Sequence, residues 1–167
     1  MSKNKERMNQ IINDLLKQND IKLKKWRTTD TGVAYPKSRE IEIPKPISIR
    51  RFCTCLHEIE HIINPKAQRP HPAYLKEYIA CTQSELKCKE YGFEIPIKEL
   101  KRNTNYVKMV ICKGLVRHGD INKIPTHILA YANINKVEWE QQIKQGLKPF
   151  TKCVKGAWEE VEVEWYK

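Results

Sequence analysis

The sequence predicts an α+β fold, with a small sheet near the N-terminus and helices over most of the remaining chain. Residues 21–28 and 33–44 alternate between apolar and polar side chains, loosely in the first stretch and cleanly within REIEI, as strands do. From residue 48 onward the pattern favours helices. The 167 residues are enough for one domain with a buried core and a modest tail.

The N-terminal elements follow from local patterns. Helical spacing of Met8, Ile11, Ile12, Leu15 and Leu16 predicts a helix over 3–19. Asp30-Thr31-Gly32 predicts a turn between the two extended stretches. Pro36 cannot donate a ladder hydrogen bond, so it places its part of the second stretch at a sheet edge or bulge.

The later elements are delimited by capping residues and prolines. Ser48 is expected to cap a helix that ends near Ile63, and a proline-marked loop follows over 64–73. The next helix is expected over 74–91, with Gly92 as its C-terminal cap. Further helices are expected over 97–117, 126–133 and 136–145. The final stretch 157–166 alternates and predicts a strand or an ordered extension.

Composition excludes several classes of protein. No stretch approaches eighteen consecutive apolar residues, so a membrane-spanning helix is not expected. The first ten residues are polar and no apolar signal core follows, which predicts a cytoplasmic protein. The net charge is +11, but 23 of the 31 basic residues are lysine. Since arginine is the better residue for bidentate base recognition, the charge is weak evidence for sequence-specific nucleic-acid binding.

The six cysteines form no CxxC pair, which excludes a zinc ribbon and a thioredoxin-like redox site. We expect most of them to be reduced and buried, behaving as small apolar side chains. Cys81 and Cys88 are seven residues apart, which places them on one helix face. Cys53 lies four residues before His57, and packing is its expected role.

The motif that carries chemistry is His57-Glu58-Ile59-Glu60-His61, an H-E-x-x-H sequence within a predicted helix. Residues four apart lie on one helix face, so both imidazoles can bind one Zn²⁺ ion. Zinc lowers the pKa of bound water toward about 7, and the glutamate after the first histidine can then take its proton. Glu60 is expected either to support the site or to be solvated.

Two histidines leave a zinc site one protein ligand short. Glu77 shares a helix face with uncharged Cys81, Ser84 and Cys88, so this face can turn inward. Glu85 instead has Lys89 four residues on, the spacing of a surface ion pair. His71 lies in a proline-flanked loop. It could be a metal ligand or a hydrogen-bond donor in the transition state, or it could simply be exposed to solvent. His118 and His127 are more distant candidates.

HEIEHIIN, followed by a loop and YLKEYIACTQSELKCKEYGFEIP, resembles the gluzincin branch of zincin metallopeptidases. It looks most like the small ImmA/IrrE-type proteins and related predicted metallopeptidases of phages and bacteria. The resemblance covers about residues 20–100. It implies a zincin minidomain, in which a small antiparallel sheet packs on the H-E-x-x-H helix and a glutamate helix. The predicted domains are therefore 1–100, metallopeptidase-like, and 101–167, a helical extension with an acidic extended C-terminal tail.

The resemblance implies zinc-dependent hydrolysis of a protein or peptide substrate. His57, His61 and Glu77 would hold Zn²⁺, and Glu58 would activate water and then protonate the leaving amine. His71 or Tyr74 would donate to the oxyanion. We also expect an extended peptide to pair with REIEI, taken as an edge strand.

Two other functions remain open on the sequence. The first is a protease on DNA-bound proteins, similar to the Spartan/SprT-like family, in which a third histidine replaces Glu77. The second is a non-catalytic zincin-fold protein that binds nucleic acid or an acidic partner. Residues 101–155 carry a net charge of +8. The two flanking segments, 1–47 and 101–167, have a net charge of +5 each, whereas residues 48–100 have a net charge of only +1. Non-specific nucleic-acid binding through these basic flanks is therefore a further expectation.

Overall fold

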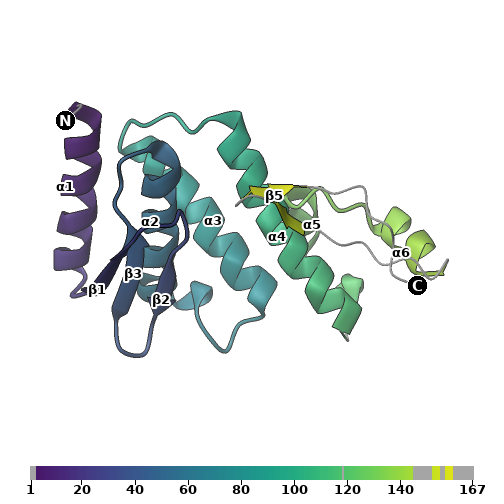
Figure 1. Ribbon diagram of the computed structural model, residues 1–167. Coiled ribbons are helices and arrows are strands. Elements are labelled where there is room, and N and C mark those ends of the chain that lie inside the picture. The colour runs from purple at the N-terminus through teal and green to yellow at the C-terminus, as the bar shows by residue number, and fades with distance from the viewer. Residues whose placement is uncertain (1–2, 118, 145–151, 155–156, 160–167) are drawn as a thin grey trace. The chain divides into compact units, whose positions relative to one another are not determined.

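The computed structural model describes residues 3–117, 119–144, 152–154 and 157–159. It confirms the α+β class, with a three-stranded sheet near the N-terminus and helices over most of the rest (Figure 1). Two compact units emerge: residues 1–72 with 79–96, and residues 73–78 with 97–167. The division into domains 1–100 and 101–167 stays a prediction.

The first unit begins with helix α1 (Lys3–Gln18), followed by strands β1 (Lys22–Arg27), β2 (Val33–Tyr35) and β3 (Glu40–Pro44). Next come helix α2 (Ile49–Ile63), the short 3-10 helix η1 (Pro65–Ala67) and helix α3 (Ala73–Glu90). The predicted helices and the strand over 21–28 are present within one or two residues. The single extended stretch predicted over 33–44 is wrong, because it forms two strands joined by a turn over 36–39. Pro36 lies in this turn, not at a sheet edge or bulge. The turn η1 inside the proline-marked loop was not predicted.

The sheet differs from the expectation in two respects. Its strand order is β1-β3-β2, with β3 parallel to β1 and antiparallel to β2. The expected all-antiparallel sheet is therefore wrong, because the sheet is mixed. The REIEI segment was also expected at an edge, and this too is wrong, because β3 is the central strand and both of its sides are hydrogen-bonded to neighbours.

The core of the first unit lies between the sheet, α1 and α2. Ile41 and Ile43 of β3 are fully buried, as are Phe52, Leu56 and Ile59 of α2. Helix α2 packs against both β2 and β3 (Figure 1). This burial holds the helix of the H-E-x-x-H motif rigidly against the sheet.

The glutamates of β3 point away from this core and are neutralised by neighbouring strands. Glu40 lies 3.7 Å from Lys22 Nζ and 3.6 Å from Lys24 Nζ, and Glu42 lies 3.3 Å from Arg27. The Ser38 hydroxyl donates to Glu40 and is the main cause that lowers the pKa of this carboxyl.

The second unit is helical, as expected for the C-terminal extension. It contains α4 (Ile97–Arg117), η2 (Ile121–Lys123), α5 (Thr126–Tyr131) and α6 (Lys136–Lys144). The Tyr78 ring makes edge contacts with the rings of His127 and Tyr131, at centroid distances of 5.6 and 5.2 Å. Through these contacts the start of α3, residues 73–78, belongs to the second unit although the rest of the helix belongs to the first.

A short antiparallel pair, β4 (Lys152–Val154) and β5 (Ala157–Glu159), completes the described chain. It confirms a strand at the start of the predicted stretch 157–166. The acidic tail beyond Glu159 lies outside the described residues, as does His118. Across the described chain, every helix is too short or too polar to cross a membrane.

Candidate metal centre

Helix α2 carries the H-E-x-x-H motif and is fixed at both ends. The Ser48 hydroxyl accepts a hydrogen bond from the Arg51 backbone N–H at 3.3 Å, which confirms the predicted N-cap. At the other end, the Asn64 N–H donates to the Glu60 carbonyl. With the apolar face buried against the sheet, His57, Glu58 and His61 lie at the half-buried border of the helix.

Among the described residues, one group has the composition of a metal site: His57, His61 and Glu77, whose ligand atoms all lie within 4.8 Å of one another. The two Nε2 atoms are 3.2 Å apart. Two nitrogens that bind one zinc ion tetrahedrally at about 2.0–2.1 Å would lie about 3.3–3.4 Å apart. Two imidazoles and a carboxylate are a donor set whose chemistry suits zinc, and the two imidazole nitrogens have the spacing that one ion needs.

The tautomer of His61 is fixed by a backbone carbonyl. His61 Nδ1 lies 2.8 Å from the Ala67 carbonyl oxygen, which can only accept a hydrogen bond. Nδ1 therefore carries the proton, and a neutral His61 offers the lone pair of Nε2. The turn η1 places this carbonyl, and the Asn64 side chain holds the turn by accepting from the Lys66 N–H at 3.1 Å. This support is typical of histidines that bind metals.

Helix α3 supplies the carboxylate, and its orientation agrees with the prediction. Cys81, Ser84 and Cys88 are buried on the same face as half-buried Glu77. The helix ends at Glu90, and Gly92 follows the cap residue Tyr91 with a φ of 76°, the left-handed conformation that favours glycine. The Phe93 N–H then donates back to the Cys88 carbonyl at 3.0 Å, so the predicted glycine cap is confirmed.

Glu58 packs against the turn between β1 and β2. A Cβ atom added to Gly32 would lie only 2.3 Å from Glu58 Cγ and 2.9 Å from its Cδ. Only a glycine leaves room for this carboxylate side chain in its present position. The sequence predicted Gly32 as part of a turn but gave no sign of this contact, because the two residues are far apart in the chain.

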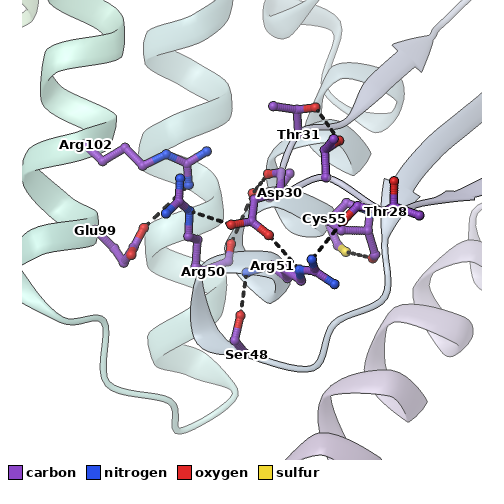
Figure 2. A network of polar contacts seen from close by, with 12 residues as sticks. Thr28, Asp30, Thr31, Ser48, Arg50, Arg51, Cys55, Glu99 and Arg102 are labelled. Atoms are coloured by element: carbon purple, nitrogen blue, oxygen red, sulfur yellow. Dashed lines mark hydrogen bonds and ion pairs between the residues drawn. The ribbon is translucent and has the colours of Figure 1, made fainter. Parts of the chain in front are cut away.

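A network of polar contacts holds that turn against α2 (Figure 2). The Asp30 carboxylate lies 2.6 Å from Arg51 Nε and 3.3 Å from Arg50 Nε. Arg51 also donates to the Thr28 carbonyl at 3.0 Å, and the Thr54 hydroxyl donates to the Asp30 carbonyl at 3.1 Å. The turn that contacts Glu58 is therefore tied to the same helix that carries Glu58.

Glu60 is buried, with an exposed fraction of 2%. It is paired with Lys87 Nζ of α3, and Asn64 Nδ2 lies 3.5 Å from its other oxygen. The solvated alternative for Glu60 is therefore wrong. Glu60 links the two helices that carry the candidate ligands, and the sequence did not indicate Lys87 as its partner.

His71 and Tyr74 are not members of the ligand group. Both are half-buried, and the His71 N–H donates to the Gln68 carbonyl within the loop before α3. Their expected roles at the oxyanion stay predictions.

The cysteines whose side chains are described are buried thiols, as expected. Cys53 Sγ lies 3.8 Å from Cys88 Sγ, between α2 and α3. Burial, followed by the charge of Glu58, raises the pKa of the Cys55 thiol, which donates to the Pro44 carbonyl. Cys81 differs from these because its Sγ lies 3.6 Å from His57 Nδ1. The side chain of Cys153 lies outside the described residues.

Comparisons with protein-family models, with curated proteins and with solved structures found no match to this chain.

Proposed function

We propose that this chain is a zinc-dependent metallopeptidase that hydrolyses peptide bonds in a protein or peptide substrate. The observation that carries the proposal is the convergence of His57, His61 and Glu77 within 4.8 Å. These residues would hold Zn²⁺. When bound, the ion supplies Lewis acidity, which polarises a carbonyl group and makes water easier to deprotonate.

Glu58 is proposed as the general base and then the general acid. Its carboxylate follows the first ligand along α2, and the contact with Gly32 limits where it can lie. It would take a proton from the attacking water and deliver this proton to the nitrogen of the leaving amine.

The sheet offers one edge for an extended substrate. Strand β1 carries Lys22, Lys24, Lys25 and Arg27 and is irregular between Leu23 and Lys25, features that discourage pairing with another strand. Strand β2 reads Val-Ala-Tyr and directly follows Gly32. We therefore move the proposed docking strand from β3 to β2, where a paired peptide would start beside the turn that contacts Glu58.

The ligand group favours the glutamate-type site over the Spartan/SprT-like alternative. The third member is Glu77, whereas the histidine that the alternative needs, His71, is not in the group.

The test combines zinc content with cleavage of a peptide library, read by mass spectrometry of new termini. We expect Glu58→Gln to keep bound zinc and to lower the cleavage rate by about 10²–10⁴-fold. Glu77→Ala should lose zinc, whereas Glu85→Ala, a matched change two turns further along α3, should keep it. Zinc-dependent cleavage that survives in Glu58→Gln would contradict the assigned base. Zinc binding without cleavage would favour the non-catalytic alternative, and no zinc binding at all would refute the metal site.

A further inference from the structure

We infer that Cys81 is a positioning residue for His57, an inference that rests on the proposed metal site. The Cys81 Sγ atom lies 3.6 Å from His57 Nδ1, while His57 Nε2 lies 3.2 Å from His61 Nε2. The thiol therefore sits at the ring nitrogen that faces away from the other ligand. Cys81 supports a ligand and is not itself a ligand of the same ion.

Binding of a metal through Nε2 would require a proton on His57 Nδ1. An imidazole that binds a metal through Nε2 is neutral, so its hydrogen is on Nδ1 and needs an acceptor. Cys81 is only 1% exposed, so bulk water is excluded from the side of the His57 ring that faces this thiol. With a metal on Nε2, the Cys81 sulfur would accept this N–H. Without a metal, the Cys81 thiol would donate to Nδ1, because His57 Nε2 then carries the proton that His61 Nε2 accepts. In both states Cys81 holds the ring with Nε2 toward His61.

The two histidines are held by acceptors of different strength. His61 Nδ1 lies 2.8 Å from a carbonyl oxygen, whereas His57 Nδ1 lies 3.6 Å from a sulfur atom, which is a weak donor and a weak acceptor. Metal-binding histidines usually have a carboxylate, a carbonyl or water in this place. We infer that the orientation of His57 is the less firmly held of the two, and that zinc affinity depends on the residue at position 81.

The position of Cys81 is set by the packing of α3 on α2. One end of this contact is the Cys53–Cys88 pair at 3.8 Å, and the buried ion pair between Glu60 and Lys87 joins the same two helices. Cys81 lies two turns from Cys88 on the same buried face, which brings its thiol to the His57 ring.

The experiment uses the full chain with Cys81→Ala, Cys81→Ser and Cys81→Asp, and Cys88→Ala as the matched control. Cys88 lies on the same face, and its thiol has the Cys53 thiol and the Phe93 carbonyl as its partners, each at 3.8 Å. Zinc affinity is measured by competition with a chromophoric chelator. We expect Cys81→Ala to weaken binding about 10–100-fold, the usual effect of losing such a partner. Cys81→Ser should stay within a few-fold of the wild type, Cys81→Asp should bind at least as tightly, and Cys88→Ala should be unchanged.

The second readout is the His57 tautomer in metal-free protein, from long-range ¹⁵N–¹H NMR correlations of the ring. We expect the Nε2–H form in the metal-free wild type and in Cys81→Ser, because His61 Nε2 can accept this proton and the group at position 81 can donate to Nδ1. In Cys81→Ala we expect a mixture of the two tautomers. Equal losses of affinity in Cys81→Ala and Cys88→Ala would reduce Cys81 to a packing residue and overturn the inference. So would an unchanged tautomer in Cys81→Ala. A wild type without zinc affinity would refute the proposed function, while the tautomer would still decide whether Cys81 orients His57.

Discussion

Gly32 shows how much a single missing side chain contributes to the candidate site. The Glu58 side chain occupies the space where any other residue at position 32 would place its Cβ, with only 2.3 Å to Glu58 Cγ. Because α2 is fixed by its buried apolar face, the helix cannot move away to relieve the overlap. The glutamate side chain has to rotate instead.

We therefore predict that Gly32→Ala displaces Glu58 and lowers peptide cleavage at least tenfold without loss of bound zinc, since a small misplacement of a reacting group is costly. Cleavage rate and zinc content measured together check this. Gly114→Ala is the control, because a Cβ there meets nothing within 4 Å. It should leave cleavage unchanged and stabilise α4 by about 0.5–1 kcal/mol. Equal activity in both variants would contradict the prediction.

Individual residues were predictable where the signal was local in sequence. The spacing of His57 and His61, and the uncharged face that Glu77 shares with Cys81, pointed to the group that the structure brings together. The roles of Gly32 and Lys87 were not predictable, because each depends on a partner at least 26 positions away. Without known pairing between elements, no local pattern identifies such partners.

The contact between α2 and α3 depends on a buried charge pair. Glu60 is almost fully buried, whereas the Lys87 side chain is 24% exposed and brings the compensating charge from the other helix. A carboxylate left in this place without its cation would lose both water and its counter-charge.

We predict that Lys87→Met destabilises the protein by about 3–5 kcal/mol, measured by urea unfolding, because it leaves Glu60 charged and buried. Adding Glu60→Gln should recover part of this loss, since the second change removes the uncompensated charge. Lys89→Met, an exposed lysine on the same helix, should change the free energy of unfolding by at most about 0.5 kcal/mol. A double variant less stable than Lys87→Met alone would contradict the assigned pairing.

At the scale of elements, helices and caps were predictable, but strand order was not. Ser48 and Gly92 carry their signals in the local chain, and both caps are confirmed. The alternation of apolar and polar residues in β3 shows that one face of the strand is buried. In a sheet with one exposed face, central strands and edge strands show the same alternation, so the pattern does not distinguish them. The central place of β3 therefore had to come from the structure.

For the whole molecule, the proposed zinc binding would be coupled to folding. The candidate ligands come from α2 and α3, so the site exists only when both helices are folded and packed. An ion that binds the folded chain alone stabilises it by about 2.7 kcal/mol at a concentration 100 times its Kd.

We predict that saturating zinc raises the melting temperature of the transition that includes α2 by roughly 5–10 °C, from the usual 2–4 °C per kcal/mol for a chain of this size. Calorimetry with zinc and with chelator checks this. His61→Ala should abolish the shift, and a shift of the same size in that variant would show that zinc acts elsewhere.

Charge is a property of the whole chain that leaves the proposed chemistry unaffected. The segment 48–100, which holds the candidate ligands, carries only +1 of the total +11. The excess lies in the flanking segments, so it bears on which partner the protein meets. Non-specific nucleic-acid binding through these flanks stays a prediction, and its affinity would fall steeply with salt.

The strand order has a consequence for how the protein is made. β3 is the last of the three strands along the chain, yet it lies between the other two. On the ribosome, β1 and β2 emerge before the strand with which each of them pairs, so the sheet begins to form only once residue 44 is available. Helix α2 follows directly and covers Ile41 and Ile43. The sheet and the helix that carries His57 and His61 are therefore expected to assemble in one step of synthesis rather than strand by strand.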